Sequence, residues 1–190
     1  MKALLRPAVT LFVILTVLTG VVYPLAVTGV GGLLFSHAAN GSIVTVNGKP
    51  VGSELIGQPF SSPGHFWGRP SATGPQPYNA AASSGSNLGP LNPALTDAVK
   101  ARIEALKAAD PDNDKPVPVD LVTASASGLD PDISLAAAYY QATRVAMARG
   151  LSVEKVQGLI EQHATRPWLG IFGEPRVNVL ALNLALAGGK

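Results

Sequence analysis

Residues 8–35, AVTLFVILTVLTGVVYPLAVTGVGGLLF, contain no Asp, Glu, Lys, Arg, His, Asn or Gln. An α-helix needs about 20 mostly apolar residues to cross the hydrocarbon core of a bilayer. This run is longer than that requirement. It therefore predicts a single transmembrane helix over residues 8–35, between a short segment, 1–7, and a long segment, 36–190.

The charges on either side of the run predict its orientation. Lys2 and Arg6 precede it, and the first Lys or Arg after it is Lys49. The remainder of the chain is neutral, so the net charge of +2 lies within residues 1–7. Basic flanking residues stay on the cytoplasmic side of a membrane. Residues 1–7 are therefore predicted to be cytoplasmic, and residues 36–190 to be extracytoplasmic.

A cleaved signal peptide is the alternative interpretation of the same run. The basic residues before it suit such a peptide, and residues 36–38, Ser-His-Ala, could form a cleavage site. The apolar region of a signal peptide is typically about 7–15 residues long, however, which is much shorter than this run. A retained anchor is the favoured prediction, and a mature N-terminus near Ala39 would contradict it.

The run also contains small and hydroxylated residues that a solitary anchor does not need. In lipid, small residues let helix backbones approach closely, and hydroxyl groups hydrogen-bond between helices. We therefore predict that this helix packs against partner helices, although an ordinary anchor would tolerate the same residues. The candidate contact positions are Gly20, Pro24, Gly29 and Gly31. Pro7 is expected in the first helical turn, and Pro24 is expected either to bend the helix or to mark a groove that faces a partner.

Local signals after the helix predict one α+β domain over residues 36–190. Asn47-Gly48, between two β-branched runs, predicts a hairpin over residues 42–53. Residues 57–95 are rich in Gly, Pro and Asn, which predicts short elements and many turns. They also hold most of the aromatic residues of the chain. An ordered lobe built from loops is therefore expected there.

Apolar spacing and capping residues predict three helices. The first covers residues 94–108. The second is capped by Ser134 and ends at Gly150, and the third is capped by Ser152 and ends near His163.

Two further segments between and after these helices are expected to be extended. Residues 117–123 predict a strand, followed by a turn over residues 125–131. Residues 177–186 suit either a strand or a helix, and Val177-Asn178-Val179 favours a strand at the start.

The composition excludes several classes of function. The chain has no cysteine, so it can form neither a disulfide nor a thiolate metal site. The neutral domain lacks the basic cluster that nucleic-acid binding requires. The run Asp110–Asp114 begins like a calcium-binding loop, but Lys115 and Leu121 stand where that loop needs Gly and Glu. No metal site is therefore predicted.

Two other functions are weighed from the residues alone. Ser125 and Ser127 could be imagined as parts of a serine hydrolase together with Asp120, Asp130 and His163. No G-x-S-x-G sequence frames either serine, so a tight turn is the favoured interpretation. The aromatic and Asn-rich residues 57–95 could instead serve a membrane-anchored solute-binding module.

Six stretches of the sequence resemble a known bacterial family. They are GQPF (57–60), FWGRPS (66–71), SNLGP (86–90), VPVDLVTASASGLDP (117–131), EPRVNV (174–179) and LNLAL (182–186). Together they are similar to the C subunit of the high-affinity potassium-transporting P-type ATPase, the Kdp complex. The resemblance extends from the membrane span to the C-terminus.

This resemblance implies a set of partners and a location. The partners are a channel-like potassium-binding subunit, a P-type ATPase subunit and a small membrane subunit, all in the bacterial plasma membrane. ATP hydrolysis belongs to the ATPase subunit, so the present chain is expected to be a non-catalytic subunit needed for assembly. The candidate contacts in the domain are Trp67, Arg69, Asn87, Ser125, Ser127, Asp130 and Arg176.

The resemblance also implies a link to ATP. The family is described as a catalytic chaperone that raises the ATP affinity of the ATPase subunit. Some members carry a Leu-Ser-x-x-Gln motif, which here reads Leu151-Ser-Val-Glu-Lys155. Ser152 and Lys155 are therefore the candidate ATP-related residues, within the complex only. An external domain cannot touch cytosolic ATP, so its effect on the pump is expected to pass through its partners.

Overall fold

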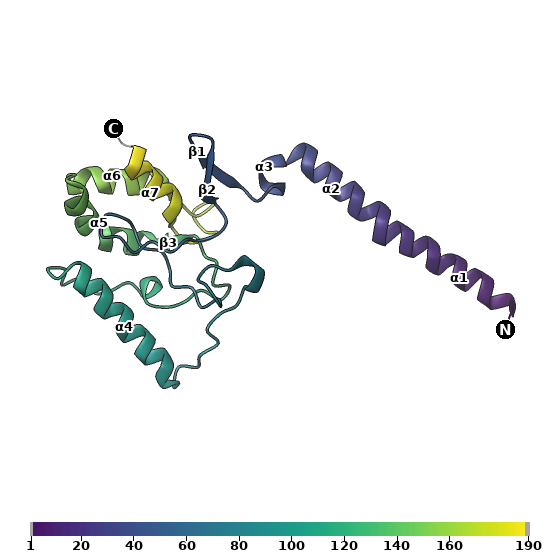
Figure 1. The fold of residues 1–190 in the computed structure, drawn as a ribbon, viewed down its shortest axis with the longest axis horizontal. Coiled ribbons are helices and arrows are strands. Elements are labelled where there is room, and N and C mark those ends of the chain that lie inside the picture. The colour runs from purple at the N-terminus through teal and green to yellow at the C-terminus, as the bar shows by residue number, and fades with distance from the viewer. Residues whose placement is uncertain (1, 189–190) are drawn as a thin grey trace. The chain divides into compact units, whose positions relative to one another are not determined.

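The structure is a computed structural model that describes residues 2–188. Its backbone packs as two compact units, with the boundary between Ile43 and Val44. Figure 1 shows the elements of both units, and each unit is described by itself below.

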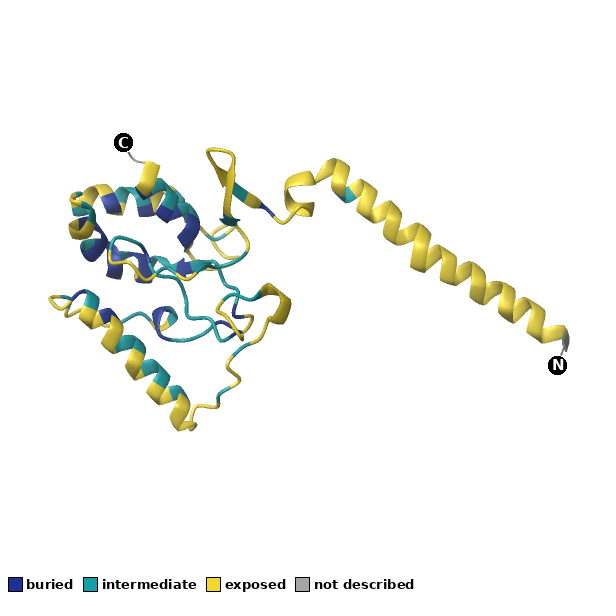
Figure 2. Ribbon diagram, viewed as in Figure 1, coloured by how far each residue is buried: buried dark blue, intermediate teal, exposed yellow. Residues whose placement is uncertain are grey.

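The first unit is almost entirely helical. It comprises α1 (Lys2–Val17), a π turn (Leu18–Val22), α2 (Tyr23–Leu34) and the short α3 (Ser36–Ala39). Residues Ala3–Leu34 form one candidate membrane span, whose most apolar 18-residue stretch has a mean hydropathy of 2.2, and no other span is found among residues 2–188. Its most apolar stretch is entirely unburied, and Figure 2 shows the helix in yellow except for a small teal patch near its C-terminal end. This apolar surface therefore needs lipid or another protein to cover it.

The two prolines of this helix are accommodated differently. The helix begins before residue 8, so Pro7 lies inside α1 and not in its first turn, which corrects the prediction. In the π turn, the N–H of Tyr23 donates to the carbonyl of Leu18, five residues back. The extra residue in this turn widens the helix just where the ring of Pro24 would otherwise meet the carbonyl of Gly20. The expected irregularity at Pro24 is thus a π turn.

The predicted hairpin is confirmed. It consists of β1 (Ile43–Val46) and β2 (Lys49–Ser53), which form a two-stranded sheet. Asn47 and Gly48 have φ values of 51° and 74°, which are the left-handed conformations that a two-residue hairpin turn requires.

The second unit is built around a small antiparallel sheet in the order β3-β5-β4. The strands are β3 (Asp132–Ser134), β4 (Ala164–Thr165) and β5 (Arg176–Asn178). In the register, Ile133 lies opposite Val177, and Ala164 lies opposite the same valine from the other side. Val177 is completely buried at the centre of the sheet.

In the described part of the chain, four α-helices complete this unit: α4 (Pro93–Ala109), α5 (Leu135–Arg149), α6 (Val153–His163) and α7 (Val179–Gly188). The hydroxyls of Ser134 and Ser152 accept N–H bonds at the starts of α5 and α6, and Gly150 ends α5 with a φ of 64°. These predicted caps are confirmed. Residues 177–186 contain the end of β5 followed by α7, so the strand expected at the start is also confirmed.

The core lies between α5, α6, α7 and the sheet, where Figure 2 shows most of the buried residues. Alanines on α5 let its neighbours approach closely, and larger apolar side chains fill the space between the elements. The largest fully buried apolar side chains are Phe66, Ile133, Val145, Val156, Ile160, Val177 and Leu182.

The predicted strand over residues 117–123 is wrong. The segment forms a short 3-10 turn, Val119–Leu121, and no described strand pairs with it. Pro116 and Pro118 cannot donate the N–H bonds of a sheet ladder. The carboxylate of Asp120 instead accepts from the N–H (2.7 Å) and the hydroxyl (3.1 Å) of Ser134, which fixes this turn to the start of α5.

Candidate functional site

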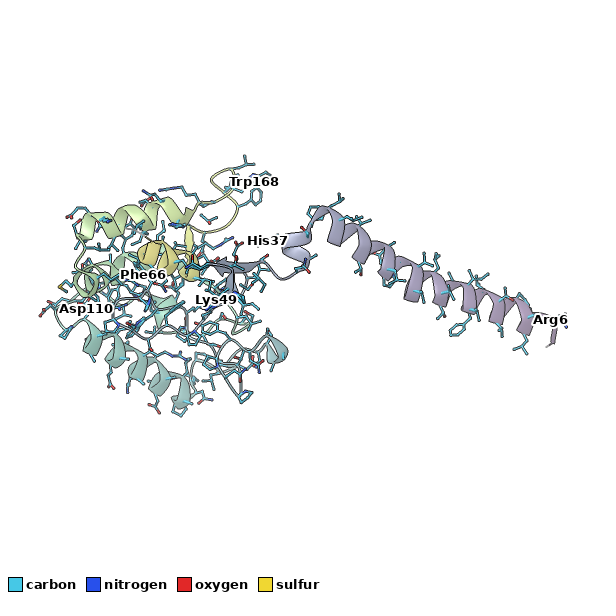
Figure 3. The ribbon with its side chains drawn as sticks, turned by 45° about the horizontal axis from the view of Figure 1, so that its top comes forward. Arg6, His37, Lys49, Phe66, Asp110 and Trp168 are labelled. Atoms are coloured by element: carbon cyan, nitrogen blue, oxygen red, sulfur yellow. The ribbon has the colours of Figure 1, made fainter. Side chains whose placement is uncertain are left out.

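The segment that carries the FWGRPS motif is held by two buried side-chain amides. Asn183 of α7 accepts from the N–H of Phe66 (2.8 Å) and donates to the carbonyl of the same residue (3.0 Å). Gln141 of α5 does the same for Trp67, at 2.8 and 3.1 Å. Each amide therefore replaces the neighbouring strand that an extended backbone normally pairs with. Figure 3 shows Phe66 among the packed side chains of the domain.

Arg144 extends this network along α5. Its guanidinium is almost completely buried and donates to the backbone carbonyls of Pro63 and His65 and to Gln141 Oε1. It also lies 4.7 Å from the centre of the Trp67 ring, in a cation–π contact. Burial lowers the pKa of Arg144 to about 10. The guanidinium thus joins the segment around residues 63–67 to α5, and its hydrogen-bond partners are all uncharged.

Arg69, which lies within the same motif, anchors it at a second point. Its Nη1 is 3.2 Å from Asp130 Oδ2, and its Nε donates to the carbonyl of Thr123. The hydroxyl of Tyr78 donates to the carbonyl of Arg69 at 2.5 Å. Arg69 therefore connects the FWGRPS motif to the VPVDLVTASASGLDP motif, which lies far from it in the sequence.

The turn over residues 125–131 is tightly built. Ser125 is buried, and its hydroxyl accepts from the N–H of Gly128 at 2.9 Å. The hydroxyl of Ser127 accepts from the N–H of Leu129. The hydroxyl of Ser71 donates to the carbonyl of Gly128 at 2.7 Å. Within the described residues neither serine of this turn is bonded to a histidine, so the geometry supplies no base for a nucleophilic serine.

A charged cleft of about 280 Å³ lies between the Arg69–Asp130 pair and the sheet. Arg176 Nε is 2.8 Å from Asp132 Oδ2 at the same place. Burial raises the pKa of Asp132, although the neighbouring Arg176 opposes the shift. The complete lining is Arg69, Asp120, Asp130, Asp132, Ile133, Ser134, Glu174, Pro175 and Arg176. Carboxylates outnumber guanidinium groups along it.

Comparison with known proteins assigns the chain to a family. The sequence model described as "K+-transporting ATPase, c chain" matches residues 5–188. The chain belongs to the KdpC family. A potassium-transporting ATPase KdpC subunit of Polaromonas naphthalenivorans is 70% identical over 98% of this chain and 95% of its own length. The corresponding subunit of Herminiimonas arsenicoxydans is 68% identical over 98% of both chains, and that of Methylibium petroleiphilum is 65% identical over the whole of both.

The structure brings together several of the residues predicted to contact partners in the KdpC family. Arg69, Asp130 and Arg176 line the charged cleft, and Ser125 and Ser127 line an open hollow on the other side of the same ion pair. We call these five residues the Arg69 surface.

The other predicted contacts lie elsewhere in the domain. Trp67 is partly buried against Arg144, and its indole N–H donates to the carbonyl of Ser62. Asn87 is exposed, with a φ of 51°. Ser152 and Lys155 are exposed at the start of α6, where the hydroxyl of Ser152 accepts from the N–H of Lys155. That hydroxyl serves as the N-terminal cap of α6.

The glycines predicted to face partner helices lie on open helix surface. A methyl group added at Gly20, Gly29 or Gly31 would meet no other atom within 4 Å. No group of three or more metal-binding side chains is found in the described part of the chain.

Sequence reasoning missed the residues that hold the motif in place. Gln141, Arg144 and Asn183 are polar residues that are at most 4% exposed. One sequence pattern could have indicated them, namely a polar residue on the otherwise apolar face of a helix. Asn183, which lies between Leu182 and Leu186 in α7, is an example. Buried polar groups need hydrogen-bond partners, so such positions indicate a backbone segment that crosses the helix.

A pH-dependent contribution to stability is expected from Tyr78. Burial, and to a smaller extent the nearby Asp130, raises the pKa of this phenol to about 12. Its ordinary value is about 10. Since the folded pKa lies above the unfolded one, the contribution is complete below about pH 10 and is lost as the pH rises through about 12. The difference in urea-unfolding free energy between the wild type and Tyr78→Phe should shrink over this range. A difference that stays constant from pH 9 to 12 would contradict the assignment.

Proposed function

We propose that the chain is the accessory C subunit of a bacterial potassium-transporting P-type ATPase. It would be anchored in the plasma membrane by residues 8–35, with residues 1–7 in the cytoplasm and residues 36–190 outside. The observation that carries this proposal is the family match over residues 5–188, since it includes both the apolar helix and the domain. Its partners are the channel-like, ATPase and small membrane subunits of the complex.

The helix supports a role in assembly. Its apolar surface is uncovered in the chain by itself, and its glycines leave room for another backbone to approach. The π turn before Pro24 interrupts the regular backbone bonding in the middle of the span. In lipid, a carbonyl without its helical donor is costly, so a partner helix with a hydroxyl or amide group suits this position.

The domain supports a docking role at the outer side of the membrane. The Arg69 surface presents charges of both signs, Asp130 from the turn, Arg69 from the FWGRPS motif and Arg176 from β5, and each of the two arginines is paired with a carboxylate. Such an arrangement selects a partner by charge complementarity more than it adds affinity. We propose that this surface lies against the outer mouth of the channel-like subunit and holds that subunit in register with the pump.

Any effect on ATP affinity would be indirect. A subunit that binds one conformation of the pump more tightly than another shifts its population, and the ATP affinity changes with it. In this proposal, Ser152 and Lys155 contribute through α6 and do not contact the nucleotide. The distinction is tested by measuring ATP binding for three complexes: one with the wild-type subunit, one with Lys155→Ala and one without the subunit. A loss of ATP affinity that occurs with Lys155→Ala but not on removal of the subunit would contradict the indirect route.

Topology and co-purification together test the proposed function. A C-terminal alkaline phosphatase fusion should be active, because this reporter works only outside the cytoplasm. The tagged chain should bring down the three partner subunits from detergent extracts. Cross-links from residues 60–90 should reach the channel-like subunit, and cross-links only to the cytosolic domains of the ATPase subunit would refute the proposal.

Replacing Gly29 by leucine is expected to weaken assembly without unfolding the domain. A bulky side chain would separate the two helix backbones, and losing about 1 kcal/mol of packing corresponds to roughly five-fold weaker association. The amount of partner subunits that co-purify should fall accordingly, and Gly20→Leu should act in the same direction. Val30→Leu on a different helix face serves as the control. Unchanged recovery for both glycine variants would exclude these positions from the interface.

A further inference from the structure

The connection between β4 and β5 carries an exposed apolar tip, which we define as residues 167–173, PWLGIFG. Trp168, Leu169, Ile171 and Phe172 are between 61% and 77% exposed. Figure 3 shows Trp168 on a loop that extends away from the packed side chains of the domain. Large apolar side chains gathered on one exposed loop indicate an interaction surface.

The backbone of the tip is closed on itself. The N–H of Trp168 donates to the carbonyl of Phe172 at 2.9 Å, and the N–H of Phe172 donates back at 3.0 Å. The N–H groups of Gly170 and Ile171 donate to Pro167 and Trp168. The rings of Trp168 and Phe172 lie 5.7 Å apart and hold the two sides of the tip together. These four donors need no partner from outside, which suits a segment that enters an apolar phase.

The tip is also free of charge. No Asp, Glu, Lys or Arg occurs between Arg166 and Glu174. Arg166 is itself paired with Glu161, at 2.6 Å. A protein partner is usually recognised through a polar rim around an apolar centre, whereas the seven residues of the tip offer one polar side-chain group, the indole N–H. Trp is enriched where a protein meets the membrane–water interface.

We propose that the tip inserts into the interfacial layer of the bilayer that anchors the chain. Its side chains would lie at the level of the headgroups and the first acyl carbons, as those of other peripheral apolar segments do. The domain would then contact the membrane at a second point besides the helix. This inference rests on the proposed membrane anchoring by residues 8–35.

Tryptophan fluorescence of the full chain in lipid nanodiscs tests the insertion, because Trp67 and Trp168 are the only tryptophans. The probes are phosphatidylcholines that carry a doxyl quencher either near the headgroup or near the chain end. For an insertion depth of about 5–10 Å, the shallow quencher should act about two-fold more strongly than the deep one. Trp168→Phe, which retains only the partly buried Trp67, should remove most of the quenching.

Phe172→Asp is the second variant, because it keeps Trp168 and adds a charge to the tip. It should abolish the quenching while the chain still elutes with the nanodiscs and unfolds at an unchanged urea concentration. Absence of quenching in an anchored wild-type chain would overturn the insertion alone, whereas failure of the chain to elute with nanodiscs would overturn the anchoring as well. Quenching in the isolated chain that disappears in the assembled complex would also overturn it and would assign the tip to a protein partner.

Discussion

Replacing Asn183 by alanine should lower the free energy of unfolding by about 3 kcal/mol or more. Leaving one buried donor or acceptor unsatisfied costs about 1–3 kcal/mol. Asn183 satisfies both the N–H and the carbonyl of Phe66, which is itself completely buried. The cavity left by the shortened side chain adds to the loss.

Urea unfolding of the full chain in detergent, followed by tryptophan emission, measures this effect. Trp67 is adjacent to the affected residue and provides a local signal. Gln157→Ala is the matched control, because Gln157 is an exposed amide on α6. Its effect should stay within about 0.5 kcal/mol. A loss below about 1 kcal/mol for Asn183→Ala would mean that water replaces the amide and that the segment around Phe66 is not fixed by α7.

Replacing Gly128 by alanine should cost about 2–4 kcal/mol. Gly128 has a φ of 67°, a conformation that costs other residues about 1–2 kcal/mol. The added methyl group would also lie 2.6 Å from Thr73 Cγ2 and 2.7 Å from the carbonyl oxygen of Ser84. Because Ser84 contributes a backbone atom, relief of this contact requires a backbone shift. The shift would disturb the turn that carries Ser125, Ser127 and Asp130, so docking should weaken together with stability.

The control for this variant is another glycine of the same domain. A methyl group at Gly158 in α6 would meet no atom within 4 Å. Alanine favours a helix by about 0.5–1 kcal/mol over glycine, so Gly158→Ala should stabilise the chain slightly. Thermal unfolding and partner co-purification of both variants give the comparison. Wild-type values for Gly128→Ala would show that the turn can relax at no cost.

The elements that were predicted correctly from sequence have their determinants nearby in the chain. Ser134 and Ser152 bond to amides three residues ahead, and Asn47-Gly48 needs only its own backbone conformation. The apolar helix is set by composition alone. In each case the stabilising partner lies within a few residues, so inspection of a short window is sufficient.

The elements that were missed depend on distant partners. Residues 117–123 have the β-branched composition of a strand, but two prolines and the bond from Ser134 to Asp120 decide their conformation. Gln141 and Asn183 act on residues that are 74 and 117 positions away. Local propensity contains no information about such pairs.

The candidate site was predicted in part, for a similar reason. The resemblance identified motifs, and the fold brings Arg69, Ser125, Ser127, Asp130 and Arg176 onto neighbouring surfaces. The fold does not bring Asn87 or Ser152 to these surfaces. A motif marks a constrained residue without saying whether the constraint is a contact, a cap or a backbone conformation. The structure separates these causes, since Ser152 is a cap and Asn87 adopts a left-handed conformation.

The buried side-chain amides of Gln141 and Asn183 also set the order in which the domain can fold during synthesis. Phe66 and Trp67 leave the ribosome before Gln141, and Gln141 leaves it before Asn183. Until α7 exists, the backbone groups of Phe66 have only water as a partner, so this part of the domain cannot close. Closure of this part of the domain therefore waits for α7, and a chain that stops before Asn183 keeps its apolar helix while the segment around Phe66 stays open to proteases.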